Sequence, residues 1–145
     1  MPLLRVLLLM GGLLGARGAA AAVPPVEVRD AWIRWLPAGL PGAGYMTLTN
    51  EGSRVWVLKD AVSAAYGSVS VHRTRERGGM STMEPVDSVV LKPHQTVRFA
   101  VGGLHLMLMQ PSRPLHPGDN VVVTLRFADG SMLDVIFPVR AGDAS

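Results

Sequence analysis

The segment NVVVTLRFADGSMLDVIFPV (residues 120–139) carries the strongest secondary-structure signal of the 145-residue chain. Two runs rich in Val, Leu, Ile and Phe flank the short turn sequence Ala128-Asp129-Gly130. Such runs on both sides of a short Gly-containing turn are typical of a β-hairpin. We therefore predict two antiparallel strands, at Asn120–Phe127 and at residues 131–139.

The rest of the chain shows the same organisation of short strands separated by turn residues. No convincing 3.6-residue period is found, so no helix is predicted. This spacing of strands and Gly, Pro and Asn turns favours an all-β fold, an antiparallel β-sandwich or barrel. Loops are predicted at residues 36–44 and 73–79, and Gly102-Gly103 predicts a second hairpin. Further strands are predicted at residues 26–35, 45–50, 55–62, 68–72, 96–101 and 104–109.

The N-terminal segment, residues 1–22, has the order of a cleaved secretory signal peptide. Arg5 is followed by an apolar run from Val6 to Leu14 and then by small residues. The run is shorter than the roughly 20 residues that a membrane-spanning helix needs. We therefore predict export to the periplasm and a mature domain at residues 23–145. An uncleaved anchor is the alternative.

Removing the signal also removes the excess of positive charge. The mature chain keeps 12 of the 14 basic residues against 11 acidic ones, because Arg5 and Arg17 leave with the signal. It has no Lys/Arg-rich tract with interleaved aromatic residues, so nucleic-acid binding is not expected. The sequence contains no cysteine. Disulfides, thiolate metal sites and lipid attachment through a thiol are therefore excluded for these residues.

The stretch GGLHLMLMQP (residues 102–111) raises the question of function. In a strand, Leu104, Leu106 and Leu108 point to one face, while His105, Met107 and Met109 point to the other. Thioether sulfur binds Cu(I) well and most other biological metals poorly, and imidazole suits both copper oxidation states. The Cα atoms of residues i and i+2 lie roughly 6.5–7 Å apart, so both side chains can reach one ion.

Two more candidate ligands lie upstream. His72 alternates with Val69 and Val71, which places it on the face opposite to the core, and Met83 follows after ten residues. Each of these two residues taken alone is more often ordinary packing or surface. Met80 and Met109 could assist such a site, but packing is the favoured interpretation for both.

The spacing His72-x10-Met83-x21-His105-x-Met107 resembles the copper-binding pattern of the periplasmic copper A chaperone family, PCuAC. The surrounding stretches are also similar to that family. They include AGYMTLTN (43–50), VHRT (71–74), MEPVDS (83–88), RPLHPGD (113–119) and FADG (127–130). Leu104 stands where the family often has an aromatic residue, and His94 and His116 lie outside the pattern.

The resemblance implies a cupredoxin-like, Greek-key β-sandwich whose ligands are His72, Met83, His105 and Met107. It implies a cargo of Cu(I), with Cu(II) possible, that is delivered to the copper centre of cytochrome c oxidase. The expected partner is a cysteine-containing acceptor, such as an oxidase subunit or its assembly factor. The protein itself is expected to be a monomer and not an enzyme.

Several alternatives remain beside this interpretation. A periplasmic storage or copper-tolerance protein would use the same ligands, whereas an electron-transfer cupredoxin would need a cysteine. A binding module with a platform of Trp32, Trp35 and Trp56 is a third possibility. Residues 73–82 are expected to form a loop that partly closes the site. Its three arginines (Arg73, Arg75 and Arg77) could steer an acidic partner, although a solvated loop is favoured.

Overall fold

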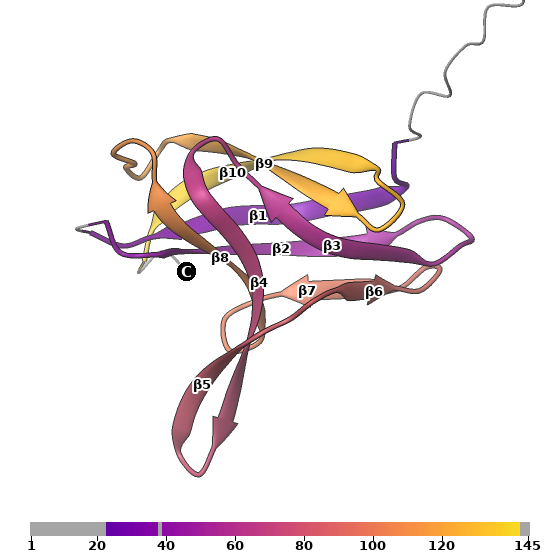
Figure 1. Ribbon diagram of the computed structural model, residues 1–145, viewed down its shortest axis with the longest axis horizontal. Helices are drawn as coiled ribbons and strands as arrows, with labels where there is room; N and C mark the ends of the chain where they lie inside the picture. Colours follow the sequence, from indigo (N-terminus) through magenta and orange to yellow (C-terminus); the bar gives the residue numbers. More distant parts are fainter. Residues whose placement is uncertain (1–22, 38, 143–145) are drawn as a thin grey trace, which may run out of the picture.

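The computed structural model describes residues 23–37 and 39–142, and within them the protein is all-β (Figure 1). The predicted signal peptide lies outside the described residues. Within them, no helix is long and apolar enough to cross a membrane. The strands are β1 (Val26–Trp35), β2 (Gly42–Asn50), β3 (Trp56–Val62), β4 (Tyr66–Arg77), β5 (Met80–Pro85), β6 (Val89–Leu91), β7 (Thr96–Phe99), β8 (Leu104–Pro111), β9 (Asn120–Phe127) and β10 (Met132–Ala141).

The strands follow one another in the order β5-β4-β8-β2-β1-β10-β9-β3-β6, and β7 pairs with β2. Among the described strands, all pairs are antiparallel except β1 with β10, which run parallel at Ile33–Val139 to Trp35–Ala141. Strand β8 lies between β4 and β2, and β9 lies between its hairpin partner β10 and the distant β3, so the chain crosses over between hairpins. The predicted all-β, mostly antiparallel fold is confirmed.

The core follows from alternation along each strand. In β9, Val121, Val123, Leu125 and Phe127 are buried, whereas the residues between them are partly or fully exposed. A strand with one face against the core and one toward water shows this period of two. Residues of β2, β3, β8 and β10 complete the same cluster, with Leu48, Leu58, Leu106, Leu108 and Phe137 fully buried.

The predicted loop at residues 73–79 is wrong. Strand β4 continues to Arg77, turns at Gly78-Gly79 with φ of 59° and 77°, and returns as β5. Two glycines suit this turn because both positions have positive φ. The β4–β5 hairpin projects beyond the body of the molecule in Figure 1. Both faces of its tip are exposed, so no hydrophobic alternation marks these residues as strands in the sequence.

The hairpin predicted at Gly102-Gly103 is also wrong. Strands β7 and β8 do not pair with each other along their length; both pair with β2. Strand β7 meets β2 at residues 46–49, and β8 meets it at residues 42–44. Strand β2 therefore begins inside the predicted loop, at Gly42. The short strand β6 was not predicted, because three residues give too little periodicity.

The side chain of Asn50 holds the end of β2 in place through three hydrogen bonds. Its side chain is fully buried; Nδ2 donates to the carbonyl oxygens of Arg54 and Leu91, and Oδ1 accepts from the amide of Gly52, each at 2.9 Å. Replacing Asn50 with Leu leaves these three backbone groups unpaired, at about 1–3 kcal/mol for each one that stays buried. We expect a loss of roughly 3 kcal/mol or more in the free energy of unfolding, measured by urea denaturation. A loss below about 1 kcal/mol would contradict this role of Asn50.

Candidate metal site on the outer face of β4, β5 and β8

Strand β4 organises the candidate site because it pairs with β8 on one side and β5 on the other. Ser70, His72 and Thr74 are successive residues of β4 on one face. Their cross-strand partners are Met107, His105 and Met83, respectively. Directly opposite residues of antiparallel strands project to the same face. The register therefore brings the four predicted ligands to one surface, opposite to the buried Val71, Leu106 and Leu108.

His105 is the most enclosed of these side chains, with 5% of its surface exposed. Its Nδ1 lies 3.1 Å from the carbonyl oxygen of Gly103. A carbonyl can only accept, so Nδ1 carries the proton in this hydrogen bond and Nε2 keeps its lone pair. Nε2 is buried and has no hydrogen-bond partner among the described residues. A fixed tautomer with a free Nε2 lone pair is the arrangement of a metal-ligating histidine.

His72 lies beside His105. The two ring centroids are 6.1 Å apart, with 22° between the ring planes. The Nδ1 of His72 lies 3.3 Å from the hydroxyl oxygen of Ser70. Its other ring nitrogen, Nε2, has no hydrogen bond within the described residues. The side chain is half-buried. In both histidines, a polar neighbour thus holds the imidazole through its Nδ1 atom.

A cavity of about 490 Å³ opens over this face. His105, Met107 and Met83 line it, together with Tyr45 and Glu76. His72 is not part of the lining and lies next to it, against His105. Tyr45 and Glu76 were not among the residues predicted for this site. No signal in the sequence marks them, because β2 and the tip of β4 reach the cavity only through strand pairing.

The methionines differ in how they lie. Met107 is half-buried on β8, whereas 58% of Met83 on β5 is exposed. Met80 is exposed on the opposite face of the β4–β5 hairpin, and Met109 is exposed two residues beyond Met107. Neither Met80 nor Met109 lines the cavity. The structure therefore brings the methionines of the spacing pattern to the cavity and leaves the other two outside it.

Residues 73–82, which were expected to form a closing loop, belong instead to the β4–β5 hairpin. Arg73, Arg75 and Arg77 alternate with the site-facing residues of β4 and lie on the other face. Arg75 forms an exposed ion pair with Glu84, with 2.7 Å between Nε and Oε2. Exposed pairs of this kind stabilise a fold by only about 0–1 kcal/mol. The arginines belong to the back of the hairpin and not to the lining of the cavity.

The three tryptophans do not form one platform. Trp56 is buried in the core edge-on against Phe127, with 5.7 Å between ring centroids. Trp35 donates its indole N–H to the carbonyl oxygen of Leu115 at 2.6 Å. Trp32 packs on Tyr45 with 5.1 Å between ring centroids. Each ring has its own packing partner, so the structure gives no support to the platform hypothesis.

The donor set decides which chemistry this face allows. The described residues contain no group of three or more His, Asp or Glu side chains that could hold a metal ion. The candidate site instead combines two imidazoles with two thioethers, all neutral in their ligating forms. Soft, neutral donors of this kind suit Cu(I) and are poor ligands for Mg²⁺, Ca²⁺ and Mn²⁺, which prefer oxygen.

Comparison with known sequences shows the family. Residues 26–139 match the model of the LpqE-like family, described as "Putative lipoprotein LpqE-like". The chain is 34% identical over 150 residues to "Putative lipoprotein Lxx21020" of Leifsonia xyli subsp. xyli, with 95% of this chain and 90% of the relative covered. The lipoprotein descriptions indicate export. Lipid attachment through a cysteine thiol does not apply to these 145 residues, because they contain no cysteine.

Comparison with solved structures shows the fold. The copper-bound PCuAC domain of PmoF2 matches with a TM-score of 0.68 and 26% identity, over 83% of this chain and 96% of that one. CuI-DR1885 of Deinococcus radiodurans matches with a TM-score of 0.63 and 30% identity, over 86% and 83% of the two chains. The resemblance predicted from the spacing of His and Met is confirmed. The chain belongs to the LpqE-like family, and its fold is that of the PCuAC domains.

Proposed function

We propose that this protein is exported, binds one Cu(I) ion and donates it to another protein. The proposed ligands are His72, Met83, His105 and Met107. The observation that carries the proposal is the buried Nε2 of His105, which has no partner among the described residues and lies in a cavity that His105 shares with two thioethers. A buried nitrogen lone pair without a partner is costly. A metal ion that accepts this lone pair removes the cost.

The ligand set supports Cu(I) in preference to Cu(II). Thioether sulfur is soft and stabilises the reduced ion, whereas imidazole binds both states. The copper-bound PmoF2 domain and CuI-DR1885 have the same fold and are 26% and 30% identical to this chain over the aligned residues. Binding of Cu(II) is expected to be weaker and to depend more on the histidines.

Exposure of the site supports donation. Met83 is 58% exposed at the edge strand β5, so an acceptor's ligands can approach the ion from that side. Thiolates bind Cu(I) more tightly than neutral thioethers and imidazoles. A reduced, cysteine-containing acceptor can therefore remove the ion by stepwise ligand exchange. We propose a cytochrome c oxidase subunit or its assembly factor as this acceptor, in the periplasm.

A storage or tolerance protein is the second candidate function. It would hold copper with the same residues, and it would gain from ligands that are shielded from competitors. The exposed Met83 favours exchange over storage. The enclosed His105 is the feature that storage would share.

An anaerobic titration tests the metal assignment. We expect binding of a single Cu(I) ion in competition with a chromogenic chelator, and no intense blue absorption with Cu(II), because that band requires a thiolate. Binding of Zn²⁺ or Mn²⁺ with an affinity close to that for Cu(I) would contradict the assignment.

Transfer is tested separately by adding a reduced dicysteine fragment of an oxidase copper-binding subunit to the Cu(I)-loaded protein. We expect the NMR signals of His72 and His105 to return to their metal-free positions as the fragment takes up copper. If the copper stays with the protein at excess fragment, donation to this acceptor is wrong and storage becomes the better explanation.

A further inference from the structure

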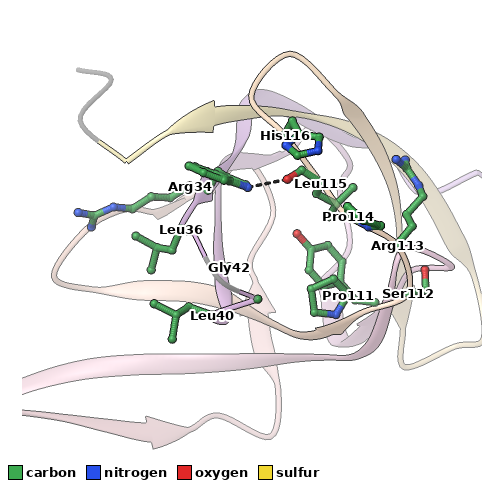
Figure 2. Close-up of a pocket in the computed structure, with 13 residues that line it drawn as sticks. Arg34, Leu36, Leu40, Gly42, Pro111, Ser112, Arg113, Pro114, Leu115 and His116 are labelled. Atoms are coloured by element: carbon green, nitrogen blue, oxygen red, sulfur yellow. Dashed lines mark hydrogen bonds between the residues drawn. The ribbon is translucent and has the colours of Figure 1, made fainter.

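A second cavity adjoins the one at the candidate metal site and shares Arg34, Leu36 and Gly42 with it, but it plays no role in the proposed copper function (Figure 2). Its volume is about 520 Å³, within the roughly 300–1,000 Å³ typical of small-molecule sites. It lies between the loop that follows β1 and the loop that joins β8 to β9. None of the four proposed copper ligands lines it.

The walls of this cavity are mainly apolar. In Figure 2, Leu36 and Leu40 lie across the cavity from Pro111, Pro114 and Leu115. The indole ring of Trp35 is held in the wall by its hydrogen bond to the carbonyl oxygen of Leu115. Mouths of β-barrels and sandwiches with such walls commonly enclose the apolar body of a ligand.

The hydroxyl group of a largely buried tyrosine opens into the cavity. Tyr66 is 8% exposed and lines the cavity, and its hydroxyl has no hydrogen-bond partner among the described residues. The hydroxyl lies over Gly42, where an added Cβ would come within 3.3 Å of it. Burial raises the pKa of the Tyr66 phenol, so at neutral pH the group keeps its proton and can donate. A phenol hydroxyl at the cavity wall can therefore donate a hydrogen bond to a bound acceptor.

The charged side chains in the described lining of the cavity are both arginines. Arg34 and Arg113 line it, and no Asp or Glu is part of the lining. Figure 2 places the guanidinium groups of Arg34 and Arg113 at opposite rims. Arg113 is only loosely engaged, with 3.8 Å between its Nη1 and the Oδ2 of Asp119. Positive charge at the rim and a phenol donor inside are complementary to an anion.

We propose that this cavity binds a small organic carboxylate with an apolar body. The body packs between Trp35, Leu36 and Leu40, and the carboxylate accepts a hydrogen bond from the Tyr66 hydroxyl and faces Arg113. Glycine at position 42 leaves room for the Tyr66 hydroxyl, because a Cβ there would lie in tight contact with this hydroxyl and with Ile33. The protein thus carries a ligand site that is separate from its metal ligands.

NMR titrations of the ¹⁵N-labelled protein with 3-phenylpropionate and octanoate test this proposal. We expect saturable shifts of the Trp35 indole N–H and the Leu115 amide. The uncharged 3-phenylpropanamide should bind to the unchanged protein about tenfold more weakly than the acids. Both acids should also bind about tenfold more weakly to the Tyr66→Phe and Arg113→Gln variants. Each of these changes removes a charge-assisted contact.

Matched variants complete the test. Arg77→Gln makes the same charge change at the tip of the projecting hairpin and should leave both affinities unchanged. His105→Asn removes a proposed copper ligand and should also leave them unchanged, so the two proposals can fail independently. The carboxylate site is refuted if neither acid gives saturable shifts at these reporters, or if the amide binds as well as the acid.

Discussion

The His105→Asn variant is expected to bind Cu(I) about 100-fold or more weakly than the unchanged protein, because disturbing only the outer partner of a metal ligand already costs roughly 10–100-fold. Asparagine keeps an N–H donor for the carbonyl oxygen of Gly103, to which His105 Nδ1 is hydrogen-bonded. It removes Nε2, the buried nitrogen that has no partner among the described residues. The fold should therefore be retained while the proposed ligand is lost.

The measurement is an anaerobic competition titration for Cu(I), with a thermal melt of the metal-free protein beside it. His94→Asn is the matched control: His94 is exposed, lies outside the site and has a φ of 61°, which asparagine tolerates. The control should keep both affinity and melting temperature. Unchanged Cu(I) affinity in a folded His105→Asn protein would exclude His105 as a ligand.

The second large effect is expected one residue further along β8. Leu106 is fully buried on the core face. Replacing it with alanine should lower the free energy of unfolding by about 2–5 kcal/mol, since it removes packed atoms and leaves a cavity. Cu(I) affinity of the folded fraction should remain close to normal, because all four proposed ligands are on the other face.

Met107→Leu is the counterpart of this change. Leucine keeps volume and hydrophobicity nearly constant, so stability should change by less than about 1.5 kcal/mol. The sulfur is lost, and Cu(I) affinity should fall. Chemical denaturation and Cu(I) competition on both variants give a crossed result. If Met107→Leu is strongly destabilised but binds copper normally, the two faces of β8 have been assigned the wrong way round.

The sequence predicted the strands that have one face in the core. Strands β1 and β9 have the predicted bounds, and β10 differs by one or two residues at its ends. In β9 and β10 every second residue packs against the core, as expected for strands buried on one side, whereas β1 alternates imperfectly and is irregular between Arg29 and Trp32. The alternation in β8 likewise placed Leu106 and Leu108 in the core and His105 and Met107 opposite to them.

The sequence could not predict strands that are solvated on both faces, or which distant strand another strand pairs with. The tip of the β4–β5 hairpin is solvated on both sides, so its polar residues resemble a loop. The pairing of β7 and β8 with different parts of β2 was also hidden, because Gly102-Gly103 is compatible with either a hairpin or a change of partner. Pairing with a distant strand was the deciding factor for β7 and β8, whereas the hairpin tip pairs locally and is hidden by its solvation.

By itself the sequence determined the fold class, the family resemblance and the residue types of the candidate site, because these follow from alternation and from spacing along one chain. Only the tertiary structure decided how those residues meet. The register of β4 with β5 and β8 puts Met83, His105 and Met107 beside Thr74, His72 and Ser70. The hydrogen bond to Gly103 selects the nitrogen of His105 that remains free, and the segments that follow β1 and β8 come together to line the second cavity. Pairing register, burial and enclosure depend on contacts between residues far apart in the chain, and a local pattern does not contain them.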